Sequence, residues 1–193
     1  WWYNPDAPSQ YNSFFGLTIM QAWRGLVYGE FPGSTSTSLP QSENAVYGFQ
    51  CYGVWQPMAM NHVLGVVTFS GGQFISSNDT WGGSFDGTNN FAFVAYAGCL
   101  TLEGCEVQNS IADVTSYGAI VDGGEVYLNG CITEFDVPFQ LSGLLTINGG
   151  RIINTQSVTD MFYIGALAAS DSRLKVNDCY IYRPNGVGSF SNK

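Results

Sequence analysis

An eight-residue pattern that recurs along the chain constrains its fold more than any other feature. LTLEGCEV at residues 100–107 has the same form as VYLNGCIT at 126–133, LTINGGRI at 145–152 and LKVNDCYI at 174–181, and VTFSGGQF at 67–74 is a weaker copy. Each copy has an apolar residue, any residue, an apolar residue, two turn-forming residues, a small residue, any residue and then mostly an apolar one. Gly, Asn and Asp tolerate the left-handed backbone that a tight corner needs. The copies therefore predict pairs of short strands joined by corners.

Two folds use such a unit. In a hairpin meander, each Asn-Gly pair would reverse the chain between antiparallel strands. In a parallel β-helix, each pair is a corner, and every strand stacks on the equivalent strand of the next coil. The alternation alone does not separate them, because both folds bury the same face. The repetition favours the β-helix, since small residues recur at one position of the pattern, as stacked coils require; they are Cys105, Cys131, Gly150 and Cys179.

Apolar runs between the copies add a third strand to each coil, at residues 91–97, 119–121, 137–141 and 162–167. Equivalent core positions then follow Phe69 at intervals of 33, 26, 19 and 29 residues, at Leu102, Leu128, Ile147 and Val176. We predict an all-β fold, a right-handed single-stranded parallel β-helix of about five to six coils. In such a fold, Asn129 and Asn148 stack at equivalent corners with parallel neighbours.

The predicted β-helix covers residues 14–182, with loop insertions at 30–44 and 76–90. Residues 1–13 are predicted to be an irregular aromatic segment, and residues 183–193 a tail or linker. Residues 14–29 read as a coil with a corner at Arg24 and Gly25, although an amphipathic helix over residues 17–27 is an alternative. A free β-helix end exposes unpaired backbone groups. We therefore expect the chain to be a fragment of a longer chain or assembly, in which missing sequence or another subunit covers that end.

The charge balance excludes some partners. The net charge is −9 with six basic residues, and an acidic surface repels nucleic-acid phosphates. No run of about 18 apolar residues predicts a membrane span. The five cysteines include no CxxC spacing, so neither a zinc site nor another metal or cofactor is expected. Three cysteines share the small-residue position of the pattern, which favours a place in the core over catalysis.

A turn-rich segment at residues 75–90 offers candidate binding residues. Trp81 lies between Asp79 and Asp86 among glycines. A tryptophan ring packs on the apolar face of a sugar, and carboxylates accept hydrogen bonds from its hydroxyls. These three residues are therefore a candidate glycan-binding set. The alternative is an ordinary loop in which Trp81 packs back against the coil wall.

Glu134, Asp136 and Asp160 are the candidate catalytic residues. Glycoside hydrolysis needs two carboxylates, about 5–5.5 Å apart for retention and about 6.5–9.5 Å for inversion of configuration. Parallel strands lie about 4.8 Å apart, so carboxylates on neighbouring coils can pair at either distance. The alternative is that these side chains only make the outer wall soluble. With six scattered basic residues, a lyase is the less favoured enzyme, and His62 is favoured as a structural residue.

The coil pattern, the Asn-Gly corners and the small stacked residues resemble right-handed parallel β-helix proteins of the pectin-lyase-like class. Within that class, the chain looks most like bacteriophage tailspikes and related receptor-binding proteins, over roughly residues 14–182. The resemblance implies a homotrimer in a virion tail, in contact with other tail proteins, that binds and often cleaves bacterial surface polysaccharide. No catalytic motif of the class matches residue by residue, so no site is transferred from it.

The expected function is that of a tailspike or tail-fibre segment that binds a host bacterial polysaccharide. Hydrolysis by paired carboxylates is left open, and so is enzyme status. A secreted polysaccharide-degrading enzyme of the same fold is the first alternative, and it predicts a carboxylate pair within one chain. A purely structural virion or surface protein is the second alternative, and it predicts that Trp81 is buried.

Overall fold

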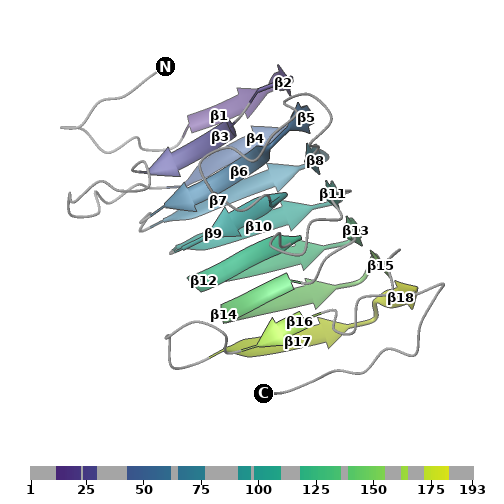
Figure 1. Cartoon of the computed structure of the whole chain (residues 1–193). Helices are drawn as coiled ribbons and strands as arrows, with labels where there is room; N and C mark the ends of the chain where they lie inside the picture. The colour runs from purple at the N-terminus through teal and green to yellow at the C-terminus, as the bar shows by residue number, and fades with distance from the viewer. Residues whose placement is uncertain are drawn as a thin grey trace.

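Every regular element of the described chain is a β-strand in the computed structural model (Figure 1). The structure describes residues 12–22, 24–29, 43–61, 65–76, 91–96, 98–109, 118–135, 139–154, 162–164 and 172–182. Their eighteen strands form two sheets, and all of the strand pairs are parallel. The parallel pairing excludes the hairpin meander, which needs antiparallel neighbours.

The smaller sheet, called the small sheet below, has seven strands in the order β18-β15-β13-β11-β8-β5-β2. Its strands are β2 (Thr18–Met20), β5 (Gln50–Val54), β8 (Gln73–Ser76), β11 (Glu106–Asn109), β13 (Ile132–Phe135), β15 (Arg151–Asn154) and β18 (Tyr180–Tyr182). Five of these strands belong to the five copies of the sequence pattern, and β2 and β5 belong to the two coils before them, so the sheet is a stack of successive coils.

The larger sheet has eleven strands and is strongly curled, with two limbs that share β12 (Ala119–Asn129) and β14 (Phe139–Asn148). Limb 1 also contains β1 (Asn12–Phe15), β4 (Asn44–Tyr47), β7 (Val66–Ser70), β10 (Cys99–Glu103) and β17 (Arg173–Asn177). Limb 2 contains β3 (Arg24–Gly29), β6 (Gln56–Asn61), β9 (Phe93–Ala95) and β16 (Phe162–Ile164). The chain visits limb 1, the small sheet and limb 2 in turn, which gives the predicted three strands per coil.

The predicted register between coils is confirmed. Phe69 pairs with Leu102, Leu102 with Leu128, Leu128 with Ile147 and Ile147 with Val176. These are the partners that the intervals of 33, 26, 19 and 29 residues require. The parallel, coil-on-coil arrangement is compatible with a β-helix-like solenoid, and uneven spacing in the sequence does not disturb the stack.

A left-handed residue turns the chain between limb 1 and the small sheet in every described coil. These residues are Gly16, Gly48, Gly71, Gly104, Gly130, Gly149 and Asp178, with φ between 49° and 67°. The sequence pattern identified five of these corners and missed those at Gly16 and Gly48. Phe15 and Tyr47 occupy the first turn position there, where the other copies have Ser, Glu or Asn. A single left-handed residue is therefore enough for the corner.

Asparagines stack at these corners as predicted. Asn148 donates a hydrogen bond from Nδ2 to Asn129 Oδ1 at 2.9 Å, and Asn177 donates one from Nδ2 to Asn148 Oδ1 at 2.8 Å. Asn148 both donates and accepts, so the three side chains form a ladder along the outside of the stack. A hydrogen-bonded ladder holds neighbouring coils in one register.

The inside of the stack is one continuous apolar core. Phe49, Phe69 and Phe74 pack with ring centroids 5.0 to 5.5 Å apart. Cys105 and Cys131 are buried in the same core at successive coils, which confirms the inward place predicted for the small-residue position. Alternating side chains thus bury one face of the strands in the middle of the stack, such as β7, β8, β10, β11 and β13, as the pattern indicated.

Two local expectations need revision. The corner predicted at Arg24 and Gly25 lies earlier, where Gln21 has a φ of 50°, and both predicted corner residues belong to β3. Glycine is required at position 25 by packing rather than by a turn, because a Cβ atom there would lie 2.1 Å from the carbonyl oxygen of Pro57. The helix considered as an alternative for residues 17–27 does not form.

The loops predicted at residues 30–44 and 76–90 lie mostly outside the described residues, as do the tail at 183–193 and most of the segment at 1–13.

Candidate glycan-binding surface

Most of the predicted site residues lie outside the described residues. Asp79, Trp81, Asp86, Asp136 and Asp160 belong to this group, and so does His62. The candidate glycan-binding set at residues 79–86 and two of the three candidate catalytic residues therefore remain predictions. Glu134 is the one candidate catalytic residue that lies within the described part of the chain.

Glu134 lies in β13 on the outer face of the small sheet. Its neighbours in the strand, Thr133 and Phe135, point into the core and are buried. The register places Glu134 between Gln108 of β11 and Ile153 of β15. The side chain is half-buried on the wall of the stack. Glu134 therefore points away from the core.

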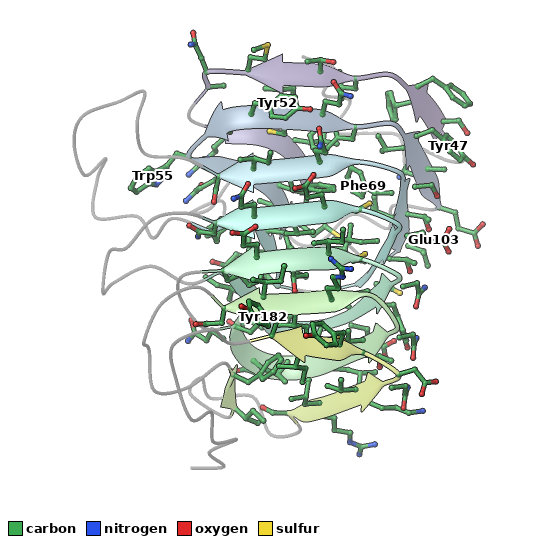
Figure 2. The ribbon with its side chains drawn as sticks, turned by 90° about the vertical axis from the view of Figure 1, so that its right-hand side faces the viewer. Tyr47, Tyr52, Trp55, Phe69, Glu103 and Tyr182 are labelled. Carbon is green, nitrogen blue, oxygen red and sulfur yellow. The ribbon has the colours of Figure 1, made fainter. Side chains whose placement is uncertain are left out.

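The outer face of the small sheet carries two parallel columns of side chains. One column contains Thr18, Gln50, Gln73, Glu106, Ile132, Arg151 and Tyr180, and the other contains Met20, Tyr52, Ile75, Gln108, Glu134, Ile153 and Tyr182. Figure 2 shows this face toward the viewer, with Tyr52 and Tyr182 labelled on it. Residues that are far apart in the sequence thus form one continuous surface.

Residues of the first column share one position of the sequence pattern. Gln73, Glu106, Ile132, Arg151 and Tyr180 all occupy the seventh position of the pattern, where any residue is allowed. Such a position shows no periodicity in one sequence, so nothing marks it as important. Once the copies are stacked, the variable position becomes a line of adjacent side chains.

Polar side chains dominate the N-terminal half of this face. The Tyr52 hydroxyl group donates a hydrogen bond to Gln73 Oε1. Gln73 in turn donates from Nε2 to Glu106 Oε2 at 2.7 Å. The three side chains link β5, β8 and β11 into a hydrogen-bonded chain across three coils. Such a chain fixes the orientation of the amide and carboxylate before any ligand arrives.

A second carboxylate, Glu106, lies near Glu134. Glu106 pairs with Ile132, two residues before Glu134 on the neighbouring strand. Neighbouring strands are about 4.8 Å apart and two residues span about 6.6 Å, so the two Cα atoms lie about 8 Å apart. That separation is compatible with the carboxyl distance of about 6.5–9.5 Å found in inverting glycosidases. Glu106 was missed as a partner because it is distant in the sequence.

Exposed aromatic side chains dominate the C-terminal end of the face. Tyr180 is 61% exposed and Tyr182 is 47% exposed. Their ring centroids are 6.4 Å apart and the ring planes differ by 11°, so the two rings are stacked with nearly parallel planes. Ile132 is exposed two strands away in the same column as Tyr180. This end offers an apolar platform on a polar wall.

A second exposed aromatic pair lies elsewhere. Phe15 and Tyr47 stack at the corner between limb 1 and the small sheet, with centroids 4.9 Å apart and ring planes 11° apart. Phe15 is 75% exposed. Figure 2 places Tyr47 at the edge of the face, near Glu103, rather than on the small sheet itself. This pair is therefore a useful contrast to Tyr180 and Tyr182.

The outer face of limb 2 is different, because it is already buried. Ala59, Phe91, Val94 and Ile120 form a second apolar cluster there, and Val94 has no exposed surface. Gln140, which lies beside Ile120 in the register, is also buried. A ligand therefore has no direct access to these side chains.

The thiol groups of Cys51 and Cys131 are unsuited to nucleophilic chemistry. Burial raises the pKa of the Cys51 thiol to about 12. The pKa of the Cys131 thiol is raised by its hydrogen bond with Cys105 and by burial. The thiolate is the reactive form of cysteine, and these environments disfavour it at neutral pH. Both residues act as small core side chains.

In the part of the chain that the structure describes, no three His, Cys, Asp or Glu side chains gather as metal ligands. Across the same residues, no helix has the length and hydropathy needed to cross a membrane. Comparison of the chain with family models, curated proteins and solved structures gives no match.

Proposed function

We propose that the chain is a right-handed parallel β-helix segment of a tailspike-like or tail-fibre-like receptor-binding protein. In this proposal, the outer face of the small sheet binds a polysaccharide of the host bacterial surface. The observation that carries the proposal is the exposed pair Tyr180 and Tyr182, which lies on the same face as a preorganised amide and carboxylate chain. Aromatic faces and amide or carboxylate groups are what a sugar chain needs.

The geometry of a stacked sheet suits a polymer in particular. Equivalent side chains recur along the columns about every 4.8 Å, so a ligand of repeating units meets a repeating surface. The face extends over seven strands. Assembly into a homotrimer with other virion tail proteins belongs to the same proposal, and so does a location in the virion tail. Asp79, Trp81 and Asp86 remain candidates for additional sugar contacts.

A second candidate function is hydrolysis of the bound polysaccharide. It is favoured by one observation, the diagonal placement of Glu106 and Glu134 on the outer face. In an inverting mechanism, one carboxylic acid would protonate the leaving oxygen, and the other carboxylate would activate a water molecule. Asp136 and Asp160 remain predicted alternatives to Glu106 as the partner of Glu134.

The test is to incubate the purified protein with immobilised capsular polysaccharides and lipopolysaccharides from a panel of bacteria. We expect retention on at least one preparation, and the same protein after heat unfolding serves as the control. Failure of the folded protein to bind any preparation would contradict the proposal and favour the structural alternative.

The same incubation tests hydrolysis. New reducing ends without unsaturated ends are expected if the carboxylates act as a hydrolytic pair. Glu134→Gln should then abolish new reducing ends but leave retention within about threefold, because it removes the titratable group and keeps the shape. Retention without any new ends would mean that the surface binds without cleaving.

A further inference from the structure

Arg151 lies next to the tyrosine platform. The register pairs Arg151 of β15 with Tyr180 of β18, so the two residues are direct neighbours in one outward column. The arginine side chain is exposed. Among the residues that the structure describes, no carboxylate forms an ion pair with its guanidinium group. This cation is therefore available to a ligand that lies across Tyr180.

The balance of acidic and basic residues along the sequence changes at Arg151. Residues 1–150 contain one basic and twelve acidic residues, whereas residues 151–193 contain five basic and three acidic ones. On the outer face of the small sheet, Arg151 is the one basic residue within the described strands. Glu106 and Glu134 lie on the coils before it. An anionic group on this face therefore meets attraction only at the C-terminal end.

We propose that Arg151, Tyr180 and Tyr182 form a subsite for a carboxylated sugar, such as a hexuronic acid, within a bacterial polysaccharide. This inference rests on the proposed function and specifies its ligand. A guanidinium group holds a carboxylate through two parallel charge-assisted hydrogen bonds. The adjacent, exposed tyrosine rings supply an aromatic surface against which the apolar face of the sugar ring packs.

Glu134 restricts where an acidic sugar can bind on this face. It lies one strand from Arg151 and two residues further along, so the two Cα atoms are about 8 Å apart. The carboxylate of Glu134 repels an anionic sugar that moves toward the N-terminal half of the face. The acidic unit is thus held at the tyrosine end, and neutral units of the polymer extend toward the amide chain at Gln73.

The experiment uses polymers retained in the panel test, each in two forms. One form is the native polysaccharide, and the other has its carboxylates reduced chemically to primary alcohols. Binding of the full chain to both forms is measured at about 0.15 M salt, so that long-range attraction between exposed charges is screened. The variants are Arg151→Gln and, as a matched control, Arg173→Gln. Arg173 is exposed at the same end of the stack but belongs to limb 1.

We expect the parent to bind the native acidic polymer about tenfold more tightly than the reduced one, as charge-assisted hydrogen bonds imply. Arg151→Gln should remove that difference, whereas Arg173→Gln should keep it. If only neutral polymers are retained, if reduction has no effect, or if both variants weaken binding equally, the carboxylate subsite is overturned and polysaccharide binding stands. If no polymer is retained in either form, the proposed function itself fails. Equal thermal unfolding of the three proteins confirms that each is folded.

Discussion

Inward and outward positions alternate along the strands of the coil stack, but the fold restricts the residue types at the inward positions far more. At the corner, the inward position holds small residues where neighbouring backbone is close, as at Gly72, Cys105, Cys131 and Gly150. The next position points outward, and it holds five chemically different residues on the same backbone: Gln73, Glu106, Ile132, Arg151 and Tyr180. The fold restricts the first set and leaves the second free.

This difference helps to locate function. A residue that the backbone requires would be present in any protein with this fold, so its identity says little about a ligand. Exposed tyrosines at positions 180 and 182 serve no requirement of the coil. Their exposed rings offer apolar surface that a bound sugar ring can cover. The predictions below test whether the two sets of positions are as different as the geometry indicates.

The largest effect is expected at Gly150. Its φ is 79°, and a Cβ atom there would lie 2.0 Å from the carbonyl oxygen of Cys131. Gly150→Ala should therefore lower the free energy of unfolding by about 4 kcal/mol or more, because backbone strain and a backbone clash add. Gly149→Ala is the control, since Gly149 has a φ of 67° and open space around it. It should cost only about 1–2 kcal/mol. Urea unfolding that gives equal losses for the two variants would refute the packing argument.

Neighbouring isoleucines in β15 allow a direct comparison of the two faces. Ile152 is 2% exposed in the core, whereas Ile153 is half-buried on the outer face. Ile152→Ala should cost about 3 kcal/mol, since it leaves a cavity, and Ile153→Ala about 1 kcal/mol. Thermal or urea unfolding of both variants measures this difference. A larger loss for Ile153→Ala would mean that the outer face of the small sheet is packed against something else.

The inward position of Cys51 predicts a pH dependence. Burial raises the pKa of this thiol from its ordinary value of 9.0 to about 12. The neutral thiol is favoured in the folded state, so its stabilisation is complete below pH 9 and is lost as the pH rises toward about 12. In that range the free energy of unfolding should fall by about 1.4 kcal/mol per pH unit from this group.

Cys51→Ala removes this contribution. The variant should be less stable at pH 8 because it leaves a cavity, but its stability should fall less steeply between pH 9 and 11 than that of the parent. Tyrosine and lysine side chains titrate equally in the parent and the variant, so the difference between the two slopes of stability against pH comes from Cys51. Parallel slopes would show that this thiol is not desolvated in the folded protein.

Much of the stack could be predicted from the sequence, because the requirements of a corner and a core act on neighbouring residues. Small residues and left-handed turns at fixed spacing identified the register from Phe69 to Val176. The corners at Gly16 and Gly48 were missed, since aromatic residues replace the usual turn formers before them. The misplaced corner at Gly25 has a related cause: a glycine was assigned to a turn, whereas the approach of Pro57 is what requires it.

The candidate surface was harder to predict. Glu134 was identified from its position in the chain, and its outward direction followed from strand alternation. Tyr52, Gln73 and Glu106 are separated by more than twenty residues at each step, so only the register between coils makes them adjacent. Only the same register shows that Arg151 and Tyr180 are neighbours. A variable position in one sequence carries no pattern until the copies are stacked.

The most direct test of the account compares two aromatic pairs in binding to a retained polysaccharide. The variants are Tyr180→Ala with Tyr182→Ala on the small sheet, and Phe15→Ala with Tyr47→Ala at the corner. The account predicts that the first double variant binds at least about tenfold more weakly, a loss of about 1.4 kcal/mol, while its unfolding stays close to that of the parent. The second should bind within about threefold of the parent. Undiminished binding by the first variant, or a greater loss in the second, would contradict the claim that the small sheet is the glycan-binding surface.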